Sequence, residues 1–183
     1  MRIVVGVTGS SGAAYAREFL RQCDAEKYLV VSKWGKAVLK DELGITVKEL
    51  LPHVKREFSD DDLSAPIASG SNHFDVCVLL PCSTSTLGKI ASGIGDTLIT
   101  RTAQVALKER FKLVLCVRET PLSTITLEQC AKLSRDGAII MPISPPTYVL
   151  PQSVEEYLRA FVDKVLGVIG LRQSEGWRAT DLR

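Results

Sequence analysis

Short apolar segments alternate with amphipathic segments along the chain. Five segments rich in Val, Ile and Leu are apolar at successive positions, at 2–8, 28–32, 75–81, 112–117 and 138–142. Because a strand buried on both faces has no polar side, these segments predict the strands of a parallel sheet. Apolar residues at helical spacing lie between them and predict helices at about 12–23, 34–43, 84–93, 99–110, 124–136 and 153–170.

This alternation of strand and helix predicts the architecture. It is typical of a three-layer α/β fold, in which an open parallel sheet carries helices on both faces, as in Rossmann-like and flavodoxin-like proteins. With 183 residues, 45% of them hydrophobic, the chain can fill one core, and we expect a single domain over 1–183. The segment 52–71 is the least regular, and we interpret it as a surface excursion and a candidate contact with another subunit.

Charge and hydropathy exclude several classes of partner. The formal net charge is +2 and the chain has no basic block, so neither nucleic acid nor a membrane surface is expected to bind. No apolar run approaches the roughly 18 residues that a membrane span needs, and no leader-like pattern opens the sequence. We therefore expect a cytoplasmic protein.

The cysteines and histidines indicate neither disulfides nor a metal. Five cysteines are an odd number with no CxxC pair, and Cys77, Cys82 and Cys116 lie in or beside predicted strands. Buried thiols in a reducing compartment are the favoured interpretation, and a nucleophilic Cys82 is the alternative. His53 and His73 are isolated, no metal-ligand spacing occurs, and no metal is expected.

Two hydroxyl-rich loops follow predicted strands, where an open α/β sheet binds its ligand. Gly9-Ser10-Ser11-Gly12 is a strand-to-helix turn whose backbone N–H groups suit a phosphate, although a serine-capped turn without a ligand is the alternative. It lacks the motifs of nucleoside triphosphate and dinucleotide loops. The second loop is Ser83-Thr84-Ser85-Thr86. Together the two loops favour a mononucleotide.

Charged residues near the fourth predicted strand add candidate chemistry. Arg118 and Glu119 follow this strand, and a carboxylate beside an arginine can accept and return a proton, although a surface ion pair is the alternative. Arg101 and Lys108 are seven residues apart, which places them on one helix face two turns from each other. Such a pair is most often part of a solvated face.

The chain resembles a known family over essentially its whole length. The segments that carry the resemblance are TGSSGAAYA, VVSKWGKAVLKDE, APIASGS, PCSTSTLGKIASG, LITRTAQVALKERFKLVLCVRETPLSTI and GAIIMPISPPTYVLPQSVEEYL, followed by Trp177. In their order and spacing they are similar to the UbiX-type flavin prenyltransferases. The resemblance implies a subunit that binds FMN and joins reduced flavin to the dimethylallyl group of dimethylallyl monophosphate. It also implies a product, prenylated FMN, used by a UbiD-type decarboxylase, and a homododecamer.

The same resemblance implies roles for individual residues. The flavin and its phosphate are expected to contact Gly9, Ser10, Ser11, Ser32, Ser83, Thr84, Ser85, Thr86 and Arg118. The allylic phosphate is expected to contact Arg101, Lys108, Tyr148 and Lys164, some of them from a neighbouring subunit. Proton movement and stabilisation of intermediates are expected to involve Ser11, Glu42 and Glu119. Trp177 and the flavin itself are candidates for stabilising an allyl cation.

The chain departs from the family's sequence pattern at two positions, and two alternative functions remain open. Lys164 stands where many members have arginine, and Thr97 follows Asp96 where an asparagine is usual. One alternative is a flavin-dependent decarboxylase that acts directly on an aromatic or cysteinyl carboxylate, the latter needing a catalytic histidine for which His53 and His73 are poorly placed. The other alternative is a flavin carrier without turnover.

Overall fold

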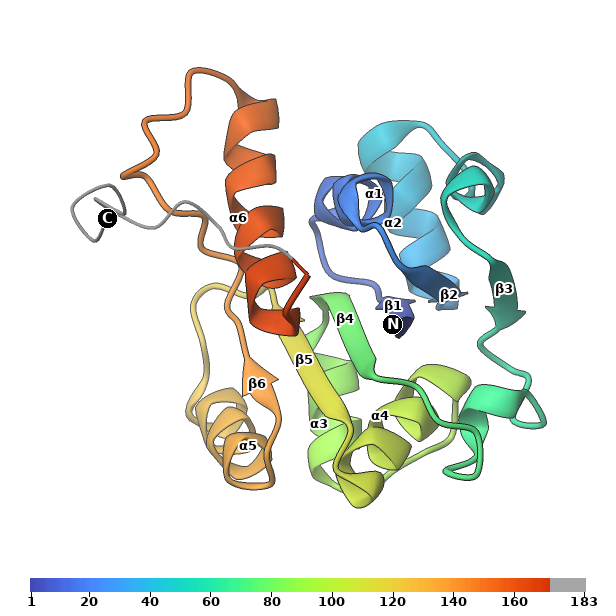
Figure 1. Ribbon diagram of the computed structural model, residues 1–183. Coiled ribbons are helices and arrows are strands. Elements are labelled where there is room, and N and C mark those ends of the chain that lie inside the picture. The colour runs from blue at the N-terminus through green and yellow to red at the C-terminus, as the bar shows by residue number, and fades with distance from the viewer. Residues whose placement is uncertain (172–183) are drawn as a thin grey trace, which may run out of the picture.

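Residues 1–171 are described by the computed structural model, and they form a six-stranded sheet with helices (Figure 1). The strands are β1 (Arg2–Val7), β2 (Glu26–Val31), β3 (Arg56–Ser59), β4 (Val76–Cys82), β5 (Lys112–Val117) and β6 (Ile139–Ile140). The helices are α1 (Ala13–Gln22), α2 (Lys33–Leu43), α3 (Thr84–Ala91), α4 (Leu98–Glu109), α5 (Thr124–Arg135) and α6 (Val154–Ile169). Two 3₁₀ helices, η1 (Val47–His53) and η2 (Pro66–Ala68), flank β3.

The sheet is parallel throughout, with strand order β3-β2-β1-β4-β5-β6. The chain runs outward from β1 in one direction, then returns through β4 to fill the other half. This reversal between β1 and β4 is the point at which open α/β sheets bind ligands. The predicted fold, an open parallel sheet of the flavodoxin-like kind, is confirmed.

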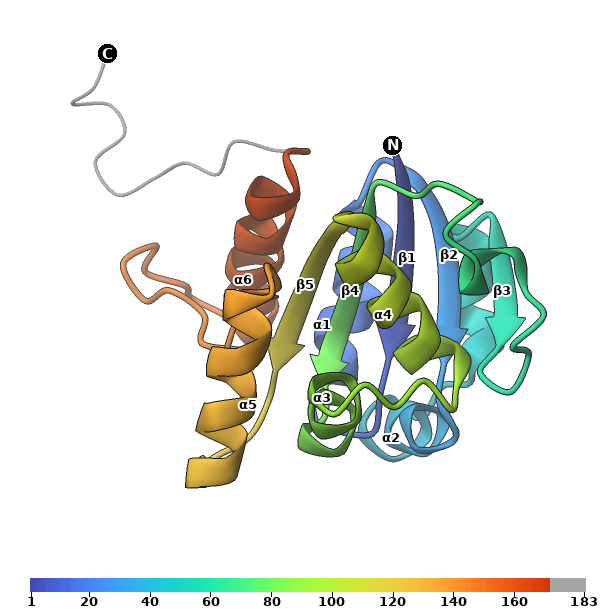
Figure 2. The ribbon, with the colours of Figure 1, turned by 90° about the horizontal axis from the view of Figure 1, so that it is seen from below.

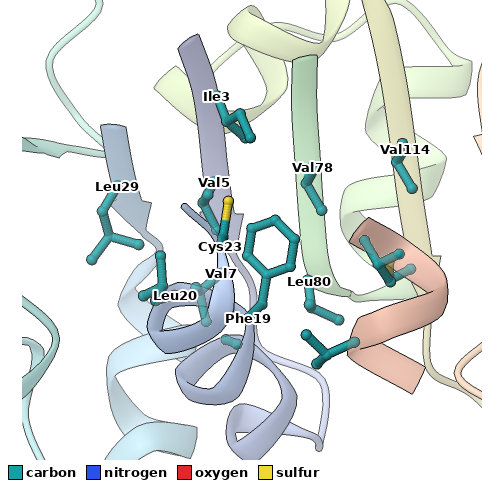
Figure 3. Close-up of a cluster of buried hydrophobic side chains, with 14 of the residues drawn as sticks. Ile3, Val5, Val7, Phe19, Leu20, Cys23, Leu29, Val78, Leu80 and Val114 are labelled. Carbon is teal, nitrogen blue, oxygen red and sulfur yellow. The ribbon is translucent and has the colours of Figure 1, made fainter. Parts of the chain in front are cut away.

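Each face of the sheet is covered by its own set of helices. Side chains of β1 alternate between the two faces, so that Val5 joins one buried cluster and Val4 joins the other. Helices α1, α2 and α6 cover the first face, and α3, α4 and α5 cover the second (Figure 1). Figure 3 shows Phe19 and Leu20 of α1 pointing toward the strands, where both are fully buried. Truncating Phe19 to alanine would cost about 3–5 kcal/mol.

The segment 52–71 is the one place where the sequence-based interpretation of the fold was wrong. It contains β3, which pairs with β2 from Tyr28–Arg56 to Val31–Ser59 at the edge of the sheet. Phe58 of β3 is buried, and so is Ile67 in η2. The segment therefore belongs to the sheet and its core. The strand escaped detection because only one of its four side chains is apolar.

The carboxyl ends of β1, β2 and β4 lie together at one end of the sheet, and α2 and α3 lie directly below that end in Figure 2. The chain therefore directs several helix N-termini toward one region. Within residues 1–171, none of the helices is long and apolar enough to cross a membrane.

Candidate functional site

A cleft of about 840 Å³ opens at the carboxyl ends of the central strands. Its size is within the range of small-molecule and cofactor sites. It includes five of the residues that the sequence predicted to bind a flavin nucleotide, Gly9, Ser32, Ser83, Ser85 and Thr86. It also includes residues that the sequence analysis did not assign, notably Trp34, Lys36, Asp60, Lys89 and Thr97. The predicted convergence of the loops after β1 and β4 is therefore present.

The N-terminus of α2 forms one wall of the cleft. Ser32 caps this helix, because its Oγ accepts a hydrogen bond from the amide of Gly35 at 3.0 Å. The amides of Lys33 and Trp34, in the first turn, have no acceptor within residues 1–171. These free N–H groups and the positive end of the helix dipole favour an anion in the cleft.

The N-terminus of α3 forms a second wall, and like that of α2 it has a serine cap followed by free amides. Ser83 caps α3 by accepting from the amide of Thr86 at 3.3 Å, and its hydroxyl lies 3.0 Å from the hydroxyl of Thr86. The next two amides, those of Thr84 and Ser85, have no acceptor in the part of the chain that the structure describes. A phosphate could therefore accept from α2 and α3 together.

Glu42 closes the N-terminus of α1, where the sequence predicted a phosphate. Its carboxylate accepts from the amide of Gly12 at 3.0 Å and from the amide of Ala13 at 2.9 Å. The backbone at Gly12 is left-handed, with φ 117°, which glycine adopts without strain and which turns these amides toward Glu42. Because a carboxylate already occupies this helix end, the α1 N-terminus does not fit the role of phosphate cradle.

Asp60 closes the N-terminus of α4 in a similar way. Its Oδ1 accepts from the amide of Ile99 at 2.9 Å, and its backbone carbonyl accepts from the amide of Leu98 at 2.7 Å. Burial raises the pKa of Asp60 above its usual range, and the hydrogen bond from Ile99 only partly opposes this. Of these four helix N-termini, those of α1 and α4 are each closed by a carboxylate from elsewhere in residues 1–171, whereas those of α2 and α3 are not.

Two lysines give the cleft a positive side. Lys36 lies on α2, one turn beyond Ser32, and is exposed. Lys89 lies on α3 and forms an ion pair with Asp96 at 2.7 Å. The sequence offered a signal for Lys36, because a residue four positions after a helix cap lies on the same face.

Trp34 is an aromatic wall that the sequence analysis did not assign. Its side chain is 67% exposed, and the Lys33 ammonium lies 5.6 Å from the centre of the indole ring. Gly9 lies so close that a Cβ there would meet the Trp34 Cβ at 2.4 Å. The predicted glycine at this position is therefore needed for the contact between the 9–12 loop and α2.

Arg118 and Glu119 lie at the end of β5 and outside the cleft residues. Both are exposed, and no ion pair joins them within the described chain. The Glu119 carboxylate accepts from the amide of Thr120 at 3.0 Å. The Arg118 side chain is near Tyr15 of α1, where its charge lowers a tyrosine pKa that burial raises more strongly.

The predicted allylic phosphate ligands do not converge in one subunit. Arg101 is in the first turns of α4, whereas Lys108 is in its last turn and pairs with Glu109. Seven residues of helix separate them by roughly 10 Å along the axis. Tyr148 is exposed in the loop before α6, and Lys164 is exposed on that helix. Ser10 and Ser11 lie beside the cleft rather than on it, and Trp177 falls outside the described residues.

The cleft lining contains no thiol and no histidine from residues 1–171. Cys77, Cys82 and Cys116 are fully buried free cysteines, as predicted, and burial raises the pKa of each thiol. His73 pairs with Asp75 at 3.3 Å near the start of β4. Within residues 1–171, no three His, Cys, Asp or Glu side chains are grouped as metal ligands.

The fold and this cleft define a mononucleotide-binding α/β protein, and comparisons with known proteins refine that class. The family model "Flavoprotein" matches residues 1–167. The flavin prenyltransferase UbiX of Thermoplasma acidophilum is 45% identical over 172 residues, which cover 93% of this chain and 96% of that protein. The chain therefore belongs to the flavoprotein family and, within it, to the UbiX-type flavin prenyltransferases.

Two solved structures extend this similarity to the fold. AnUbiX in complex with FMN and dimethylallyl pyrophosphate has a TM-score of 0.92 and 38% identity, covering 97% of this chain and 98% of that chain. A dodecameric FMN-dependent UbiX-like decarboxylase from Escherichia coli O157:H7 also has a TM-score of 0.92, with 36% identity and the same coverage. The resemblance that the sequence motifs indicated is thus confirmed.

Proposed function

We propose that this chain transfers the dimethylallyl group of dimethylallyl monophosphate to reduced FMN and so makes prenylated FMN. The observation that carries the proposal is the cleft walled by the free N-termini of α2 and α3, in a chain that is 38% identical to a UbiX solved with FMN and an allylic diphosphate. The cleft has the chemistry of a phosphate site, and the similarity supplies the class of ligand.

The FMN phosphate accepts hydrogen bonds from the first-turn amides of α2 and α3 in this proposal. Ser32 and Ser83 cap these helices, and Lys36 and Lys89 neutralise the dianion from the same two helices. The flavin ring then extends toward the 9–12 loop, where Gly9 leaves room only for backbone. In this proposal a flavin proton is handled by Ser11, which lies in that loop, and by Glu42, whose carboxylate accepts from the amide of Gly12 in the same loop.

The allylic phosphate lies between subunits. Arg101, Lys108, Tyr148 and Lys164 are exposed and spread over α4, α6 and the loop before α6, so one subunit does not assemble them. A homododecamer would let neighbouring chains complete the set, and the dodecameric relative supports this arrangement. Lys164 has a single ammonium group where an arginine would have a planar guanidinium that donates two parallel hydrogen bonds. Its contact with the phosphate is therefore less directional.

These residues suit the ionisation of an allylic phosphate. The C–O bond breaks, the phosphate departs with the electron pair, and the allyl cation forms a bond to the reduced flavin. Cations and the Tyr148 phenol stabilise the leaving phosphate. Closure of the fourth ring uses up the C=C bond of the transferred group. One alkene carbon takes a proton and the other bonds to a flavin carbon, which then releases its own proton to the exposed Glu119 carboxylate, with the released phosphate as the competing base.

The product must leave this protein, and we propose a UbiD-type decarboxylase in the cytoplasm as its recipient. The alternative of a direct decarboxylase has less support from the site. His53 ends η1 and His73 pairs with Asp75, and neither contributes to the cleft. Neither histidine is therefore positioned for chemistry on a ligand in this cleft.

The experiment that tests the proposal separates flavin binding from prenyl transfer. Alanine variants of Lys108 and Lys164 and the Tyr148→Phe variant should bind FMN normally but lose roughly ten- to hundredfold in kcat/KM for dimethylallyl monophosphate. Glu119→Gln should bind both substrates and stall before the fourth ring closes. Lys48→Ala, another exposed lysine, is the matched control. Variants with unchanged kcat/KM would overturn the assignment of these roles.

A further inference from the structure

Thr8 is a buried residue between two of the loops that shape the cleft. It follows the last residue of β1 and precedes Gly9, and only 2% of its surface is exposed. Its Oγ1 donates to the carbonyl of Pro81 at 2.8 Å and accepts from the amide of Ser83, also at 2.8 Å. The Thr8 amide donates to the same Pro81 carbonyl at 3.2 Å. One side chain therefore joins the loop after β1 to the loop after β4.

The hydrogen bond to Ser83 fixes the start of α3. Ser83 is the capping residue, and its hydroxyl accepts from the amide of Thr86, so its backbone orientation sets the direction of the whole first turn. The free amides of Thr84 and Ser85 follow immediately. Because the Ser83 amide is already satisfied by Thr8, it does not compete for a ligand in the cleft, and the two amides beyond it point where α3 points.

We infer that Thr8 is a positioning residue for phosphate recognition at the N-terminus of α3. This inference rests on the proposed binding of FMN through its phosphate. A valine at position 8 keeps the shape of the side chain but removes both hydroxyl hydrogen bonds. The Pro81 carbonyl retains the Thr8 amide as a donor, whereas the half-buried Ser83 amide loses its acceptor, which costs free energy. The first turn of α3 then moves to satisfy Ser83, and its free amides no longer face the phosphate.

The test compares the affinities of FMN and riboflavin, which differ by the phosphate. The expected result for Thr8→Val is an FMN affinity lower by about tenfold, with riboflavin affinity nearly unchanged. Thr8→Ser keeps the hydroxyl. It should therefore retain the ratio of FMN affinity to riboflavin affinity that the unmodified protein has. Thr102→Val is the matched control, because Thr102 is also fully buried and its hydroxyl donates to the carbonyl of Ile67 at 3.3 Å. It should leave the ratio unchanged.

A folded Thr8→Val protein with the unmodified FMN-to-riboflavin ratio would overturn the inference. Should the valine variant fail to fold, Thr8→Cys decides the matter, because a thiol is a weak donor and acceptor at similar volume. A lowered ratio in that variant supports the role of Thr8, and an unchanged ratio overturns it. Equal affinity of the unmodified protein for FMN and riboflavin would instead overturn the phosphate site itself, so the two failures are distinguishable.

Discussion

The carboxylate of Glu42 accepts a hydrogen bond from the amide of Ala13 at 2.9 Å, which places an acidic side chain of α2 on the N-terminus of α1. The amide of Gly12 donates to the same carboxylate. The end of α1 is thus neutralised from within the protein, and we expect an incoming anion to meet the N-termini of α2 and α3 instead.

Replacing Glu42 by alanine should lower the free energy of unfolding by about 1 kcal/mol, because two helix-end amides lose their acceptor. Urea denaturation measures the change. Asp41→Ala, a substitution at the neighbouring exposed position of α2, is the control and should have a much smaller effect. Equal losses for the two variants would show that the cap contributes nothing.

Replacing Lys36 or Lys89 by alanine should weaken FMN binding by about five- to tenfold and leave riboflavin binding unchanged. The reason is the loss of a cation beside the phosphate at an exposed site, where such contacts are modest. Flavin fluorescence titration gives both affinities. Lys40→Ala, farther along α2, is the control. An equal loss for FMN and riboflavin would place the phosphate elsewhere.

Asp60 should make stability depend on pH in a defined direction. Its pKa is raised by burial, so the folded protein holds this proton more tightly than the unfolded chain does. Stability then falls as pH rises from about 3.9, the ordinary carboxyl value, through the raised pKa of the folded state. Asn keeps a cap for α4 without a charge. The stability gain of Asp60→Asn should therefore grow with pH across this window.

The measurement is urea denaturation of both proteins at a series of pH values. Asp41→Asn, at an exposed position of α2 away from Asp60, serves as control and should show no such pH dependence. A stability difference between Asp60→Asn and the unmodified protein that stays constant with pH would contradict the assignment.

Cys82→Ala should retain kcat, because burial raises the pKa of this thiol and keeps it protonated and inaccessible at neutral pH. Steady-state assay of a folded, FMN-binding variant checks this. Loss of turnover with flavin binding intact would restore the nucleophile hypothesis.

The sequence predicted the central strands because their signal is strong. In β4 every side chain is buried, so the apolar run is continuous and admits few other structures. The edge strand β3 was missed, because Phe58 is its only buried residue and its other side chains match those of a loop. The sequence therefore revealed β4 and not β3 because β4 is buried on both faces, not only because it is longer.

The site was predictable to the level of loops but not of hydrogen bonds. Gly9, Ser32 and Ser83 follow strands at the ligand-binding edge, which a general rule for α/β sheets identifies. Which helix ends remain free depends on Glu42 and Asp60, which reach amides 30 and 39 residues away in sequence. Such contacts form only when the sheet is assembled, and no local pattern encodes them.

Prenyl transfer changes the mass of the flavin, and mass spectrometry detects that change. The purified protein is incubated without oxygen with reduced FMN and dimethylallyl monophosphate, and the flavin is then extracted and weighed by mass spectrometry. We expect a reduced flavin in which one dimethylallyl group has replaced one hydrogen, formed without added metal. Flavin of unchanged mass from the folded, FMN-binding protein would contradict it.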